Sequence, residues 1–217
     1  MTKWFLFDCF DTILIKRKSH LFDWNKQISD ELHMDERIVG EIRKKAISTV
    51  ASRSSICEYS FRDAMINFYE RYLSINDYQV SISLENFYEE ALQIEVECIT
   101  KSVLCNCSLI KKINRIKSEG NKVIVLSDFY LGKEYFSNLF ENKGITIVFD
   151  DILVSCDINA NKSSGTAYQY FLDKYEISSK DCTMLGDNFY SDYYRAKQNG
   201  LCAKWYRTPS EKNCLKH

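Results

Sequence analysis

Short apolar runs recur along the C-terminal half of the chain, and one more lies close to its N-terminus. Each run is only a few residues long, which is typical of a buried strand and too short for a helix. The runs are Trp4–Phe7, 123–126, 147–149, 152–154, 182–185 and 202–206.

In the stretches between these runs, apolar residues three or four positions apart predict helices. The predicted helices are Leu109–Ile116, Glu134–Lys143, Thr166–Lys174 and Asp192–Asn199. Strands that alternate with helices in this way form right-handed βαβ units. We therefore expect an α/β fold, with a Rossmann-like parallel sheet flanked by helices.

The stretch from about Phe22 to Val103 has helical periodicity and no convincing strand. Its apolar residues repeat at helical spacing, first as Trp24, Ile28 and Leu32, and then as Ile38, Ile42 and Ile47. The pattern predicts an all-helical domain of residues 16–104. This domain would be inserted into an α/β core domain of residues 1–15 and 105–217.

Composition excludes several classes of protein. The formal net charge of −1 and the absence of a long basic run argue against a nucleic-acid partner, and we expect Lys16 to Lys18 to be solvated. No signal peptide is recognised, and no apolar run is long enough for a membrane span. Nine cysteines without a Cys-x-x-Cys pair predict free, mostly buried thiols in a reducing, cytoplasmic environment.

Polar residues follow three of the predicted strands, and a further one precedes a predicted helix. They are Asp8 with Asp11 and Thr12, Ser127 with Asp128, Lys162, and Asp187 with Asp192. The carboxyl ends of parallel strands meet at one edge of a sheet, which is where ligands bind in open α/β folds. We therefore expect these residues to converge, although they are far apart in the sequence.

Together these residue types suit phosphate chemistry. Carboxylate oxygens are the ligands that Mg²⁺ prefers, and a lysine with a serine hydroxyl beside the metal suits a phosphate group. A carboxylate held near both is a candidate nucleophile.

The same residues carry a resemblance to a known family. Phe7–Leu14, Leu126–Asp128, Lys162 and Met184–Asp192 resemble, in order, the four motifs of the haloacid dehalogenase-like (HAD) hydrolase superfamily. The helical insertion lies where that family has its C1 cap domain. The resemblance spans Trp4 to about Tyr206.

The resemblance implies a role for each motif residue. Asp8 would be the nucleophile that forms an aspartyl-phosphate, while Ser127 and Lys162 would hold the phosphoryl oxygens. Mg²⁺ would be bound by the Asp8 carboxylate, the Phe10 carbonyl and Asp187, with Asp192 as a further ligand or a support. Thr12 and Asp128 complete the predicted substrate-binding residues.

Two positions depart from the family pattern. Phosphatases of this family usually carry a second Asp where this chain has Phe10, and commonly a Gly where it has Asp11. The missing Asp protonates the leaving group and later activates water. Three interpretations stay open: Asp11 replaces it, the substrate has a good leaving group or the phosphoryl group is transferred, or the chemistry is not phosphoryl transfer. Dehalogenases of the superfamily have an aromatic Tyr at the position of Phe10.

We therefore expect a Mg²⁺-dependent phosphatase or phosphohydrolase that acts on a small phosphorylated metabolite. One alternative is a dehalogenase-type hydrolase that acts at carbon and works in the presence of EDTA. Another is a catalytically weak module of this fold that binds phosphorylated ligands or a protein partner.

Overall fold

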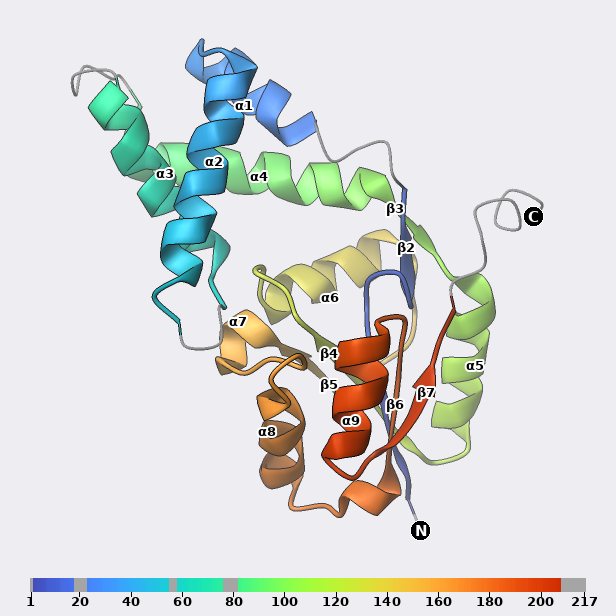
Figure 1. Cartoon of the computed structure of the whole chain (residues 1–217). Coiled ribbons are helices and arrows are strands. Elements are labelled where there is room, and N and C mark those ends of the chain that lie inside the picture. Colours follow the sequence, from blue (N-terminus) through green and yellow to red (C-terminus); the bar gives the residue numbers. More distant parts are fainter. Residues whose placement is uncertain (1, 18–22, 55–57, 76–81, 208–217) are drawn as a thin grey trace. The chain divides into compact units, whose positions relative to one another are not determined.

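The computed structural model describes residues 2–17, 23–54, 58–75 and 82–207 (Figure 1). The chain forms two compact units. One comprises Met1–Lys16 and Leu104–His217, and the other is Arg17–Val103. The predicted start of the helical stretch at Phe22 lies outside the described residues.

The first unit is built on a five-stranded sheet in the order β5-β4-β1-β6-β7. Every neighbouring pair of strands is parallel. The strands are β1 (Trp4–Phe7), β4 (Lys122–Ser127), β5 (Asp151–Val154), β6 (Cys182–Gly186) and β7 (Cys202–Trp205). The predicted fold class, a Rossmann-like parallel sheet flanked by helices, is confirmed.

Helices connect these strands. They are α5 (Cys107–Ser118), α6 (Lys133–Asn142), α7 (Ser155–Ile158), α8 (Thr166–Tyr175) and α9 (Arg195–Gln198), with a 3₁₀ turn at Ser179–Asp181. A π-helical turn at Phe189–Tyr194 precedes α9, so the predicted helix 192–199 begins earlier than expected and is not a regular α-helix throughout.

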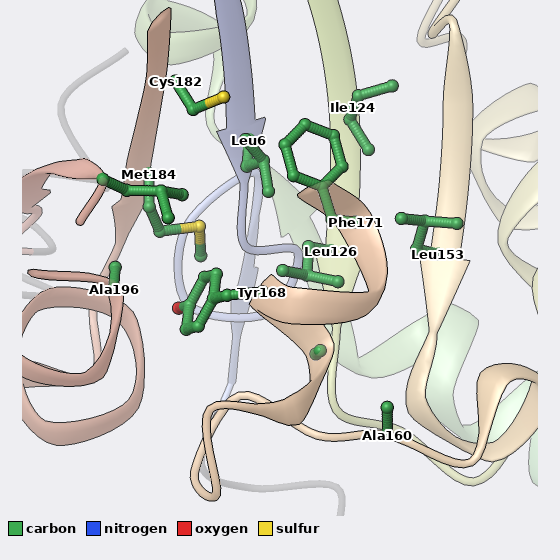
Figure 2. Close-up of a cluster of buried hydrophobic side chains, with 12 residues drawn as sticks. Leu6, Ile124, Leu126, Leu153, Ala160, Tyr168, Phe171, Cys182, Met184 and Ala196 are labelled. Atoms are coloured by element: carbon green, nitrogen blue, oxygen red, sulfur yellow. The ribbon is translucent and has the colours of Figure 1, made fainter. Parts of the chain in front are cut away.

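The centre of this unit is a cluster of apolar side chains between the sheet and α8. Figure 2 shows Tyr168 and Phe171 of α8 beside Leu6 of β1 and Leu126 of β4. All four side chains are at most 1% exposed. This packing explains why the strand sequences read as continuous apolar runs, because parallel strands are covered by helices on both faces.

The described part of the second unit consists of helices and their connections, and it ends at Val103. Its helices are α1 (Asp23–Leu32), α2 (Glu36–Ala51), α3 (Phe61–Ile75) and α4 (Leu84–Ser102). The aromatic rings of Trp24, Phe68 and Phe87 form its core, with Phe68 and Phe87 stacked at 5.3 Å between ring centroids. None of the helices in the described ranges has the length and apolarity that a bilayer span requires.

Four expectations from the sequence were wrong. Residues 147–149 are not a strand, because backbone pairing with β4 begins only at Asp150, whose N–H donates to the carbonyl of Val123. Val103–Cys105 is a short strand, β3, which pairs with β2 (Leu14–Lys16).

The other two errors concern burial. On α2 the buried residues are Val39, Ile42, Ala46 and Val50, whereas Ile38 is 42% exposed. Ala46 is fully buried on this face, and a pattern of isoleucines alone does not reveal it. Only three of the seven described cysteines are buried, although all seven are free thiols.

The apolar cluster around α8 gives the first prediction. Phe171→Ala should lower the free energy of unfolding by about 3–5 kcal/mol, because it leaves a cavity beneath the sheet. Tyr170→Ala, at the neighbouring exposed position, is the control and should cost less than about 1 kcal/mol. Urea unfolding followed by circular dichroism measures both. Equal effects of the two substitutions would contradict this account of the core.

A second prediction concerns Asp151 on the edge strand β5. Its carboxylate accepts hydrogen bonds from Lys133 Nζ (2.5 Å), Lys174 Nζ (2.8 Å) and Tyr175 Oη (2.7 Å), which joins β5 to α6 and α8. Burial acts to raise the pKa of Asp151, but these donors outweigh it and hold the pKa below its ordinary value. At acidic pH the unfolded chain therefore takes up a proton here before the folded chain does.

Asp151→Asn should consequently destabilise the protein at neutral pH, by roughly 1 kcal/mol because the pairs are partly exposed to solvent. The difference from the unmodified chain should shrink as the pH falls below about 4, the ordinary pKa of an aspartate. Unfolding midpoints measured across this pH range test it, with the exposed Asp173→Asn as the control. If the difference in unfolding midpoint between Asp151→Asn and the unmodified chain grew on acidification, it would refute the stabilising role of the Asp151 carboxylate.

Candidate active site

The carboxyl ends of three neighbouring strands supply the predicted site residues. Asp8 directly follows β1, Ser127 is the last residue of β4, and Asp187 directly follows β6. The backbone N–H of Asp8 donates to the carbonyl of Leu185 on β6 at 2.9 Å, so Asp8 still belongs to the hydrogen-bonded edge of the sheet. The parallel register therefore brings these residues together.

A polar cavity of about 280 Å³ opens at this edge. Every predicted site residue except Thr12 lines it, namely Asp8, Phe10, Asp11, Ser127, Asp128, Lys162, Asp187 and Asp192. Thr12 is buried directly beside it, and its hydroxyl donates to Asp187 Oδ1 at 3.4 Å. The structure thus brings the whole predicted set into one place.

Lys162 lies at the centre of this set. Its Nζ is 2.5 Å from Asp8 Oδ1 and 2.7 Å from Asp192 Oδ1, and all three side chains are buried. Burial alone would lower the pKa of Lys162, but Asp8, Asp192 and Asp128 hold it well above its ordinary value. The lysine is therefore a permanent buried cation, and its charge is matched by carboxylates from two distant motifs.

Asp128 positions the backbone of Lys162. The N–H of Lys162 donates to both carboxylate oxygens of Asp128, at 3.0 and 3.2 Å. Burial raises the pKa of Asp128, although Lys162 opposes the shift. Asp128 follows β4 directly, so it fixes the loop of the third motif to the end of that strand.

The fourth motif is held by its own side chains. The carbonyl oxygen of the Asn188 side chain accepts from the N–H groups of Tyr190 and Ser191, both at 3.0 Å, and so begins the π-helical turn. In return the Asn188 N–H donates to Asp192 Oδ2 at 3.0 Å. A Cβ atom at position 186 would collide with the Asp192 carboxylate, which explains why Gly186 precedes the acidic loop.

Three carboxylates of the site converge closely enough to share a metal ion. One oxygen each from Asp8, Asp187 and Asp192 lies within 4.8 Å of the others. Burial raises the pKa of Asp8 to about 7, with Lys162 opposing and Asp192 and Asp187 adding to the shift. Such crowding of buried negative charge is relieved by a cation, and an all-oxygen donor set fits Mg²⁺.

The first-motif loop explains the two departures from the family pattern. Asp11 has a φ of 58°, a left-handed conformation that glycine adopts freely and aspartate tolerates better than most residues. Its Oδ1 accepts from the backbone N–H of Lys16 at 3.1 Å. The ring of Phe10 packs against Phe129 and Phe136, with centroids 4.5 and 5.8 Å away. An aromatic wall thus occupies the position of the usual second carboxylate.

Four residues of the cavity were not assigned a role from the sequence: Lys16, Phe129, Asn188 and Ser191. Asn188 carried a signal, because asparagine at the end of a strand commonly caps the turn that follows. Lys16 was expected to be solvated, and it is exposed, yet its side chain also lines the cavity.

Solved structures with the same architecture are HAD-type proteins. A HAD phosphatase from Thermococcus onnurineus matches with a TM-score of 0.61 and 20% sequence identity, over 97% of this chain and 88% of that one. A 2-haloacid dehalogenase from Pseudomonas syringae pv. tomato DC3000 matches with a TM-score of 0.71 and 15% identity, over 95% and 86% of the two chains.

A third match is the magnesium-bound YfnB protein of Bacillus subtilis, described as a HAD-hydrolase with interdomain movement. Its TM-score is 0.59 at 13% identity, over 94% of this chain and 88% of that one. No protein-family profile and no curated protein matches the sequence. The chain therefore has the fold of the haloacid dehalogenase-like hydrolases.

Proposed function

We propose that the chain is a Mg²⁺-dependent phosphohydrolase that acts on a small phosphorylated metabolite through an aspartyl-phosphate on Asp8. The observation that carries this proposal is the buried cluster of Asp8, Lys162 and Asp192, with Asp187 beside it. It combines a nucleophilic carboxylate, a fixed cation and an oxygen-donor set in one cavity.

Each residue has a chemical part in the proposed reaction. A carboxylate oxygen of Asp8 attacks phosphorus, and Lys162 offsets the charge that develops on the phosphoryl oxygens. Ser127, which lines the same cavity at the end of β4, donates its hydroxyl hydrogen to one of these oxygens. Asp8, Asp187 and Asp192 would hold Mg²⁺, together with the Phe10 carbonyl. When bound, the ion supplies Lewis-acid stabilisation of the phosphoryl charge.

A dehalogenase-type reaction at carbon is the second candidate. The aromatic side chain of Phe10 at the cavity wall favours it, as does the likeness to the Pseudomonas syringae dehalogenase. The two candidates differ in their need for the metal. Reaction at carbon should proceed in EDTA, whereas phosphoryl transfer should not.

The proposed nucleophile is tested by phosphate release from a panel of phosphorylated metabolites, with Mg²⁺ and with EDTA. Asp8→Asn should lower kcat at least about a thousandfold, because it removes the attacking group. Asp173→Asn, an exposed change of the same kind, should leave kcat unchanged. EDTA should abolish release, and Mg²⁺ should restore it.

Halide release from 2-haloacids in EDTA, without phosphate release, would instead support the dehalogenase reaction. Ligand-induced stabilisation without any turnover would support a binding module and overturn the enzymatic proposal.

The metal site has a test that does not depend on activity. Calorimetric titration with Mg²⁺ should show binding that Asp187→Asn weakens about tenfold or more, since one of three carboxylate ligands is lost. The matched control is again Asp173→Asn, which should bind Mg²⁺ as the unmodified chain does. Unchanged affinity in Asp187→Asn would exclude this carboxylate as a ligand.

A further inference from the structure

Lys16 lines the cavity from the end of β2 and belongs to none of the four motifs. Its ammonium lies 4.7 Å from the centroid of the Phe10 ring. Lys16 and Phe10 therefore form one wall of the cavity, on the side where a second carboxylate would otherwise stand.

The charges that line the cavity are unequal. Five carboxylates face it (Asp8, Asp11, Asp128, Asp187 and Asp192) against two lysines. Lys162 is already paired with Asp8 and Asp192. Within the described residues Lys16 makes no ion pair, so its charge is available to an anionic group that enters the cavity.

The first-motif loop holds Lys16 in this place. The carboxylate of Asp11 accepts the backbone N–H of Lys16, and the N–H of Asp11 donates to the carbonyl of Leu14 at 2.6 Å. The same loop begins at Asp8, the proposed nucleophile. The backbone of Lys16 is therefore tied to the loop that carries Asp8, and the ammonium has a favourable contact with the Phe10 ring at the cavity.

We propose that Lys16 stabilises the negative charge on the departing group, and that the substrates are phosphates whose leaving group departs as an anion, such as acyl phosphates or phosphoanhydrides. This inference rests on the proposed phosphohydrolase function and adds its substrate class. Phe10 has no proton to give, so an alcohol would have to leave as an alkoxide, which is a far poorer leaving group than a carboxylate or a phosphate. A carboxylate or phosphate leaves without protonation, and a nearby ammonium assists it.

The step is balanced without proton transfer. An oxygen of Asp8 forms a bond to phosphorus while the bond from phosphorus to the leaving-group oxygen breaks. The electron pair of that bond stays on the leaving-group oxygen, which departs as an anion beside the Lys16 ammonium. The phosphoryl group remains on Asp8 until the oxygen of a water molecule attacks its phosphorus. The bond between phosphorus and the Asp8 oxygen then breaks, Asp8 is again a carboxylate, and the phosphate leaves with the protons of the water.

The test compares phosphate release from acetyl phosphate, 4-nitrophenyl phosphate, phenyl phosphate and glycerol phosphate, with Mg²⁺ and the chain of 217 residues. Lys16→Met removes the charge but keeps a long apolar side chain over Phe10, and Lys16→Arg keeps the charge. Lys111→Met, at an exposed position of α5, is the matched control.

The unmodified chain should hydrolyse acetyl phosphate at least about a hundredfold faster than glycerol phosphate, which is the usual contribution of a general acid. Lys16→Met should lower kcat/KM, which reports the step in which the leaving group departs, about tenfold for phenyl phosphate and no more than about threefold for acetyl phosphate, because a poorer leaving group depends more on the cation. Lys16→Arg should stay within about threefold of the unmodified chain for every substrate, and Lys111→Met should not differ from it.

Each negative result would overturn a different part of the proposal. An equal loss on every substrate, or no loss, would overturn the role of Lys16 and leave the phosphohydrolase standing. Glycerol phosphate hydrolysed as fast as acetyl phosphate would overturn the substrate class. No phosphate release from any of the four by the unmodified chain would overturn the proposed function and, with it, the role of Lys16.

Discussion

A buried lysine between two buried aspartates is the interaction on which the rest of the site depends. Burying an ammonium or a carboxylate alone is very costly, so Lys162, Asp8 and Asp192 are stable inside the protein only together. The cluster joins the end of β1, the loop before α8 and the turn after β6. Removing Lys162 would leave two buried carboxylates without a compensating charge at the point where these segments meet.

This constraint also links fold to chemistry. The parallel sheet supplies the strand ends, Asp128 fixes the backbone of Lys162, and Gly186 leaves room for the Asp192 carboxylate. The lysine offsets only part of the negative charge, which leaves Asp187 and the remaining carboxylate oxygens for the metal ion that we propose. Carboxylates that repel one another at close range favour the binding of a cation, and a cation beside a lysine favours the binding of a phosphate.

Most of the sheet and of the candidate site could be predicted from the sequence, because buried parallel strands appear as short apolar runs. Trp4–Phe7 and residues 123–126 are apolar runs that stop at a polar residue, and the polar residue marks the carboxyl edge of the sheet. The convergence of Asp8, Ser127 and Asp187 in one cavity follows from that edge alone, whereas Lys162 comes from the loop before α8. Helix α8, which carries Phe171, could also be predicted from the sequence, since the spacing of its apolar residues matches the face that it buries.

Other features depend on tertiary contacts that leave no local pattern. Strand β3 is only three residues long and exists because β2 is beside it. The burial of the Phe10 ring depends on Phe129 and Phe136, from distant parts of the chain. Lys16 has the sequence context of a surface lysine, and only the first-motif loop, with Asp11 at positive φ, places it at the cavity.

The most direct test of the account is whether Asp8 becomes phosphorylated. The protein would be mixed with acetyl phosphate and Mg²⁺, quenched in acid within milliseconds to seconds, digested and analysed by mass spectrometry. We expect a phosphoryl group on the peptide that contains Asp8 and on no other peptide. Phosphate release without any modification of that peptide, or a phosphoryl group on another residue, would contradict it.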